Sequence, residues 1–208
     1  MDDKNTNRTI EYYNTHADRY SEITRNADMS DIYKRFEEHL KPGSRILDLG
    51  CGSGRDSKYF LDKGYDVVSL DASETMCKKT YELTGRPALN MRIEDINCEN
   101  EFDAVWACAS MLHVDKGDMI KIFAKVMKAL KIGGVFYASW KYGKGEQTRD
   151  DGRTFANYTE TKVCDMVYSV SGAALEDVWT SQDVRPDRTG QGHLWVCLLY
   201  TSPSPRDS

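Results

Sequence analysis

The chain has 208 residues and a net charge of −5, and 40% of its residues are hydrophobic. This length fits one domain with a sizeable core, and no apolar run is long enough to cross a membrane. The acidic balance argues against a nucleic-acid surface. The six cysteines form no CxxC pair, so neither a metal site nor a disulfide framework is predicted. The polar N-terminus "MDDKNTNR" lacks the apolar stretch of a signal peptide, which favours a cytoplasmic protein.

The first 40 residues or so are expected to form lid helices in front of the main fold. Residues 9–24 read as one helix that carries Tyr12, Tyr13 and Tyr20. These rings either close over a ligand or form the buried face of a covering helix, and both interpretations stay open.

Strands and helices then alternate along the chain. The expected strands are 44–50, 65–71, 88–95, 102–110 and 135–143. Helices are expected at 56–64, 73–85 and 118–134; the last places Ile120, Phe123, Val126, Met127 and Leu130 on one face and stops at Gly133–Gly134. This alternation predicts an α/β fold with a doubly wound, mostly parallel sheet and helices on both of its faces.

The last third of the chain departs from that pattern. Residues 141–158 are polar and rich in glycine, which predicts a long loop, and a helix is expected from about Thr159. Residues 175–186 and 192–196 read as two strands whose connection is too short for a crossover helix. They should therefore pair antiparallel, which brings the sheet to seven strands.

The C-terminus raises a question about its origin. Residues 197–207, "CLLYTSPSPRD", match one reading frame of a common sequencing adapter, so residues 197–208 are interpreted as a non-native, adapter-derived tail. A natural Ser/Pro-rich tail is the alternative. The genuine domain would then comprise residues 1–196.

Three glycines fall within five positions of "ILDLGCGSGRDS" (46–57), where the first strand meets its helix. A P-loop would have Lys and Ser or Thr after its last glycine, but Arg55 and Asp56 follow Gly54. A dinucleotide fingerprint would have a glycine at position 55. Asp71 ends the second strand, where an acid normally holds a ribose.

The pattern D-L-G-C-G-S-G resembles that of class I S-adenosylmethionine-dependent methyltransferases, and especially the small methyltransferase-domain proteins that include the tellurite-resistance methyltransferases. The resemblance extends from about Tyr12 to Val196 and includes Asp71, the sequence "IEDI" (93–96) and the final strand pair. It implies a Rossmann-like methyltransferase fold over residues 1–196, with S-adenosyl-L-methionine as cofactor and methyl transfer as activity.

The same resemblance implies roles for single residues. Glycine lets the methionine part of the cofactor lie against the backbone of Gly50, Cys51, Gly52 and Gly54. The remaining implied contacts are Asp48 at the cationic end, Asp71 on the ribose, Ala72 and Met76 around the adenine, Asp95 on the adenine amino group, Ile96 on its ring, and Cys108. Alternatively, Asp48 and Asp71 cap helices, and Met76 and Cys108 belong to the core.

The class of methyl acceptor is inferred mainly from sequence motifs that the chain lacks. The segment "WACASMLHVD" (106–115) lacks the Pro-Pro pair of enzymes that methylate amino groups in DNA, and no Pro-Cys pair typical of cytosine-C5 enzymes occurs. We therefore expect direct in-line transfer to a nucleophilic atom of a small molecule. An RNA-modifying methyltransferase of the same fold, or a non-catalytic or dinucleotide-binding Rossmann protein, are the alternatives.

Two further groups of residues are candidates for deprotonating or binding the methyl acceptor. His113 is the candidate general base; the alternative is that it anchors its loop or packs under the N-terminal helix. The basic side chains of the expected loop, together with Tyr142, select an anionic acceptor or are simply solvated. These loop residues are Lys141, Tyr142, Arg149 and Arg153.

Overall fold

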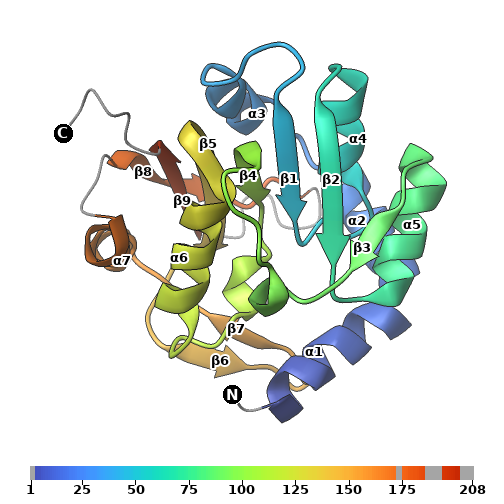
Figure 1. Cartoon of the computed structure of the whole chain (residues 1–208). Helices are drawn as coiled ribbons and strands as arrows, with labels where there is room; N and C mark the ends of the chain where they lie inside the picture. The colour runs from blue at the N-terminus through green and yellow to red at the C-terminus, as the bar shows by residue number, and fades with distance from the viewer. Residues whose placement is uncertain (1–2, 172–174, 186–193, 202–208) are drawn as a thin grey trace.

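The structure is a computed structural model that describes residues 3–171, 175–185 and 194–201 (Figure 1). Its main sheet contains β1 (Arg45–Leu49), β2 (Asp66–Asp71), β3 (Ala88–Asn90), β4 (Phe102–Ala107), β5 (Leu130–Lys141), β8 (Leu175–Gln182) and β9 (Leu194–Thr201). The helices are α1 (Asp3–Thr15), α2 (Ala17–Arg25), α3 (Ser30–Glu37), α4 (Arg55–Asp62), α5 (Glu74–Thr84), α6 (Met119–Ala129) and α7 (Glu160–Ser171). Two short 3₁₀ turns, η1 (Ile93–Asp95) and η2 (Met111–His113), follow β3 and β4.

The strand order of the sheet is β3-β2-β1-β4-β5-β9-β8. The first five strands along the chain pair in parallel, whereas β9 is antiparallel to both β5 and β8. The predicted seven-stranded, mostly parallel sheet that ends in an antiparallel pair is therefore confirmed.

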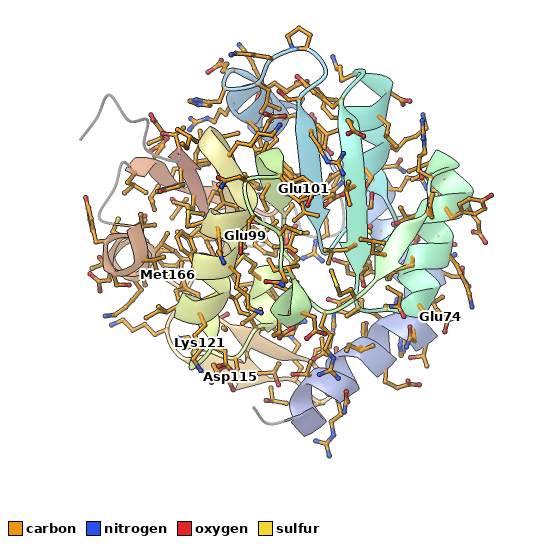
Figure 2. The ribbon with its side chains drawn as sticks, viewed as in Figure 1. Glu74, Glu99, Glu101, Asp115, Lys121 and Met166 are labelled. Atoms are coloured by element: carbon orange, nitrogen blue, oxygen red, sulfur yellow. The ribbon has the colours of Figure 1, made fainter. Side chains whose placement is uncertain are left out.

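Two hydrophobic layers cover the two faces of the sheet. Because side chains alternate along a strand, Ile46 packs with α3 and α4 on one face, whereas Leu47 packs with α6 and α7 on the other. Charged side chains such as Glu74 and Lys121 lie on the outside (Figure 2). Among the residues described, no helix is long and apolar enough to cross a membrane.

The N-terminal segment forms two helices where one was predicted. The break falls at His16, whose φ of −116° and ψ of 18° are not helical. The Thr15 hydroxyl donates to the carbonyls of Glu11 and Tyr12, and the His16 ring stacks on Tyr12 with centroids 4.2 Å apart. Such side-chain bonds to the preceding turn compete with helix continuation.

The buried face of α6 also differs from the prediction. Ile120 is 52% exposed, while Met119 and Ile122 are buried together with Phe123. The helix ends at Ala129 because Leu130 turns to extended geometry and starts β5, so the predicted stop at Gly133–Gly134 lies inside that strand.

The segment expected to be a loop folds into a hairpin below the sheet (Figure 1). Its strands are β6 (Glu146–Thr148) and β7 (Thr154–Ala156), which pair antiparallel. The hairpin contacts α1, because the Thr154 backbone N–H donates to the Thr9 hydroxyl at 3.4 Å.

The stretch interpreted as adapter-derived supplies five of the eight residues of β9 (Leu194–Thr201). Residues 197–200 are all buried, and β9 bonds to β5 on one side and β8 on the other. This strand inserts between β5 and β8, antiparallel to both. The adapter origin itself stays a prediction.

Leu198→Ala should lower the free energy of unfolding by about 2–5 kcal/mol, because it leaves a cavity around a fully buried position of β9. Leu194→Ala, on the same strand but 40% exposed, should change it by about 0.5 kcal/mol or less. Chemical denaturation measures both values. Equal effects of the two substitutions would contradict a buried central β9.

Candidate functional site

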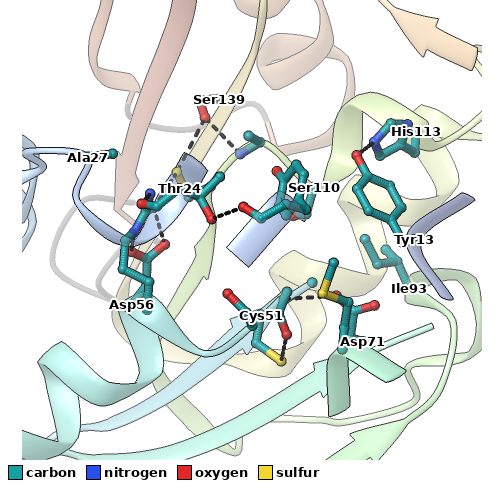
Figure 3. A pocket seen from close by; sticks show the side chains of 18 of the residues that line it. Tyr13, Thr24, Ala27, Cys51, Asp56, Asp71, Ile93, Ser110, His113 and Ser139 are labelled. Carbon is teal, nitrogen blue, oxygen red and sulfur yellow. Dashed lines mark hydrogen bonds and ion pairs between the residues drawn. The ribbon is translucent and has the colours of Figure 1, made fainter. Parts of the chain in front are cut away.

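A cavity opens at the carboxyl ends of the parallel strands, beside the glycine turn that follows β1 (Figure 3). This edge of a doubly wound sheet is the usual place for a ligand. Its inner wall comprises Gly50, Cys51, Gly52, Ser53, Asp71, Ala72, Met76, Cys108, Ala109, Ser110 and His113. Helix α1 covers it with Thr6, Thr9, Ile10 and Tyr13.

The glycine turn that follows β1 is fixed by the neighbouring strand. The backbone N–H groups of Gly50 and Cys51 both donate to the Leu70 carbonyl at 2.9 Å. A Cβ on Gly50 would lie 2.3 Å from the Ser110 Cβ, so close packing requires glycine there. Gly52 has a φ of +57° and no atom within 4 Å of its Cβ position, so this part of the turn borders open space.

Asp71 lies at the end of β2 with its carboxylate on the cavity wall. Its oxygens accept the backbone N–H groups of Ser73 at 2.8 Å and Gly52 at 2.9 Å. Burial raises the pKa of Asp71, while these two hydrogen bonds lower it. A carboxylate has about four lone-pair positions, so acceptor capacity remains for a ligand.

The structure brings eight of the twelve predicted site residues to the cavity. They are Gly50, Cys51, Gly52, Asp71, Ala72, Met76, Cys108 and His113. The other four, which do not line it, are Asp48, Gly54, Asp95 and Ile96.

Each of these four has a structural reason to lie elsewhere. Asp48 is buried and accepts the Ser57 hydroxyl at 2.5 Å. Gly54 packs against α5, where a Cβ would lie 2.9 Å from the Thr80 Cα. Asp95 is exposed and Ile96 is in the core, because the turn η1 leads the chain away. Arg92, Ile93 and Glu94 line the cavity in their place.

His113 is held by both of its ring nitrogens. Nδ1 lies 2.8 Å from the Thr154 carbonyl oxygen, and Nε2 lies 2.8 Å from the Tyr13 hydroxyl (Figure 3). A carbonyl can only accept, so Nδ1 carries the proton and Nε2 accepts the Tyr13 hydroxyl proton. Burial lowers the pKa of His113 to about 4, so the ring is neutral at neutral pH.

A buried ion pair next to the glycine turn was not anticipated from the sequence. Arg55 Nε and Nη2 donate to the two oxygens of Asp56 at 2.6 and 2.9 Å. Asp56 also accepts the Tyr33 hydroxyl and the Trp106 indole N–H. Both members of the pair line the cavity, and Arg55 reaches the Thr24 carbonyl at 3.3 Å.

Ala109 adopts a backbone conformation that is rare for a residue with a side chain. Its φ is +53°, and its N–H donates to the Ser139 hydroxyl at 2.9 Å. Such conformations persist where the surroundings impose them, and they cluster at ligand sites. Nothing in the local sequence indicates this.

The basic residues of the expected loop do not line the cavity. Arg153 lies over the Tyr12 ring at 3.8 Å, and Lys141 lies over the Phe155 ring at 3.2 Å. The Arg153 contact connects the hairpin to α1, and the Lys141 contact connects it to β5. Within the described ranges, no cluster of three or more acids, cysteines or histidines could hold a metal ion.

Part of the chain is similar to known methyltransferases. A family profile described as a methyltransferase domain matches residues 46–134. The putative methyltransferase YqeM of Bacillus subtilis is 33% identical over 131 residues, which are 59% of this chain and 53% of YqeM. Phosphoethanolamine N-methyltransferase 1 of Arabidopsis thaliana is 29% identical over 168 residues, 76% of this chain and 33% of that protein. The chain thus spans about half of the first relative and a third of the second.

A solved structure with the same fold extends the comparison. The 1,6-didemethyltoxoflavin-N1-methyltransferase of Burkholderia thailandensis, crystallised with 1,6-didemethyltoxoflavin and S-adenosylhomocysteine, has a TM-score of 0.75. The match covers 96% of this chain and 88% of that one at 17% identity. At this identity the likeness shows the shared fold.

The buried His113 should make folding sensitive to acid. Its pKa of about 4 lies below the unfolded value of 6.5, so the unfolded chain binds the proton first as the pH falls. The stabilisation is complete above pH 6.5 and is lost towards pH 4, by up to about 3 kcal/mol. Unfolding measured against pH should show this loss in the native chain and not in His113→Gln. His39→Gln, at an exposed histidine, should retain the loss of stability in acid. If the free energies of unfolding of the native chain and His113→Gln differ by the same amount at every pH, His113 is not the group responsible.

Proposed function

Because residues 46–134 form a methyltransferase domain and the chain has the class I S-adenosylmethionine-dependent methyltransferase fold, we propose that it methylates a small molecule. The methyl group of S-adenosylmethionine would pass directly to a nucleophilic atom of the acceptor. The observation that carries this proposal is the glycine turn, whose open side at Gly52 faces the cavity beside the Asp71 carboxylate.

The residues present fit S-adenosylmethionine as cofactor. Gly52 has no side chain, and no other atom lies within 4 Å of the point where its Cβ would be. The methionine part of the cofactor can therefore lie against the Gly52 backbone. Asp71 offers a buried carboxylate for the ribose hydroxyls, and Ala72, Met76 and Ile93 offer apolar contact for the adenine. When bound, the cofactor supplies an activated methyl group on a sulfonium.

Several observations favour a small acceptor. The named relatives act on phosphoethanolamine and 1,6-didemethyltoxoflavin, both small molecules. Helix α1 covers the described cavity, and the lining lacks the basic excess that RNA binding needs. Three arginines there face four acids: Arg55, Arg92 and Arg185 against Asp56, Asp71, Glu94 and Asp183.

His113 would act on the acceptor through Tyr13. Tyr13 lines the cavity, and its hydroxyl already donates to His113 Nε2. A proton that leaves the acceptor can pass to the Tyr13 oxygen while the hydroxyl proton passes to Nε2. At neutral pH the His113 ring is neutral, so Nε2 carries no proton and the Thr154 carbonyl holds the ring orientation through Nδ1. Because the pKa is low, His113 is a weak base and holds the transferred proton only transiently. Tyr13 is then the catalytic residue, and His113 positions it and takes its proton.

Cofactor binding tests the proposal most directly. S-adenosylhomocysteine should raise the melting temperature, and NAD should not, because only a matching ligand stabilises the folded state. Asp71→Ala should weaken S-adenosylhomocysteine binding at least tenfold, about 1.4 kcal/mol, in calorimetry. Asp66→Ala, at the exposed start of the same strand, should bind like the native chain. Stabilisation by NAD alone would overturn the proposal.

The role of Tyr13 can be tested separately from binding. Tyr13→Phe keeps the ring but removes the hydroxyl, so kcat should fall about a hundredfold or more. Affinity for S-adenosylhomocysteine should change little. Tyr12→Phe is the matched control, since among the described residues the Tyr12 side chain shows only ring contacts. Formation of S-adenosylhomocysteine with an acceptor-containing extract measures turnover. An unchanged rate and pH profile in Tyr13→Phe would exclude this role.

A further inference from the structure

Beyond the glycine turn, the lining of the same cavity includes residues of α2, β5, β8 and β9. We call this part the acceptor chamber, and its walls are Tyr20, Met29, Ile32, Tyr137, Ser139 and Trp195. It lies on the other side of β4 from Asp71, because the strand order runs β2-β1-β4-β5-β9. A molecule in this chamber would therefore approach the glycine turn from the side opposite the ribose acid.

The charged groups at the chamber are already compensated within the protein. Arg55 forms its two-pronged ion pair with Asp56. Arg185 pairs with Asp183 through Nε at 2.9 Å and through Nη2. Burial raises the pKa of Asp183, but the bonds from Arg185 and Trp195 outweigh it and leave that pKa lowered. An acceptor that brought a phosphate into this chamber would add a charge without a matching cation, which is costly in a buried site.

Aromatic rings dominate the rest of the chamber and are held in place by neighbours. Tyr137 stacks on Trp106 with centroids 4.2 Å apart, and Tyr20 meets Tyr13 edge-on at 5.1 Å. The bond to Asp183 orients Trp195. Among the described residues Tyr20 forms hydrogen bonds through its backbone and none through its hydroxyl, which is therefore available to a ligand. The Ser139 hydroxyl, in contrast, accepts the Ala109 N–H. Rigid rings with a few hydroxyls suit a flat, conjugated ligand with a polar edge.

We propose that the methyl acceptor is an uncharged, flat aromatic or heteroaromatic molecule with a hydroxyl or ring N–H as the methylated group. This inference rests on the proposed methyl-transfer function and adds the substrate class. It separates this chain from its relative that acts on phosphoethanolamine, because phosphate recognition would require a cation beyond the two paired arginines of the chamber.

The first test identifies the chemical class of the product. The protein is incubated with methyl-labelled S-adenosylmethionine and a deproteinised cell extract, and the products pass through anion- and cation-exchange resins at neutral pH. Label in the uncharged fraction, together with near-ultraviolet absorption, supports the proposal. Label retained on the anion exchanger, or in a product without such absorption, overturns it while leaving methyl transfer intact. Absence of any labelled product overturns methyl transfer itself.

The second test asks whether the chamber selects that acceptor. With the purified acceptor fraction, Trp195→Ala should raise KM at least tenfold, and Trp195→Phe should recover most of the loss because a ring remains. Leu194→Ala, the exposed neighbour on the same strand, should match the native chain. All three should bind S-adenosylhomocysteine normally. An unchanged KM in Trp195→Ala, or a loss of S-adenosylhomocysteine binding there, would place the acceptor elsewhere.

Discussion

The buried carboxylate of Asp56 joins the N-terminal helices to the sheet. It accepts donors from α3 through Tyr33, from β4 through Trp106, and from its neighbour Arg55, which itself reaches α2. Leaving such a group without partners costs about 3–5 kcal/mol, so the four elements are held in one arrangement. Because α2 and α3 also form one wall of the acceptor chamber, this carboxylate determines where that wall lies.

The same ion pair influences what the cavity can bind. Arg55 stands where a dinucleotide-binding turn would have its third glycine, and its charge is neutralised by Asp56 at the floor of the cavity. At the end of β2, Asp71 adds a negative group, which would suit the cationic cofactor proposed above. In the acceptor chamber the charged side chains are paired, and the other walls are rings, Met29, Ile32 and Ser139. The part of the cavity beside Asp71 and the acceptor chamber therefore differ in charge, and we expect them to prefer different ligands.

The sequence was most informative where function depends on local chain geometry. The glycine turn, Asp71 and the mostly parallel sheet follow from short-range patterns, and Gly50, Gly52 and Asp71 do line the cavity. Contacts between segments that are far apart in the sequence leave no such local pattern. For His113, packing under the N-terminal helix was one of the two predicted alternatives, and the ring does meet Tyr13, 100 residues away. The dependence of the strained Ala109 on Ser139, 30 residues away, was not predicted. Asp95 misses the cavity because β3 ends at Asn90 and a 3₁₀ turn follows, a boundary that propensity does not fix.

The C-terminal strand shows how backbone pairing and side-chain selectivity can have separate origins. The ladder between β9 and its neighbours uses backbone groups that almost every residue supplies, so an apolar stretch such as Cys197–Tyr200 completes it. Selectivity needs particular side chains. Cys197 offers the cavity a thiol already in contact with the Tyr137 and Ser181 hydroxyls, whereas Trp195 offers a ring. Acceptor choice should therefore depend on residues before position 197, whatever the source of the strand's second half.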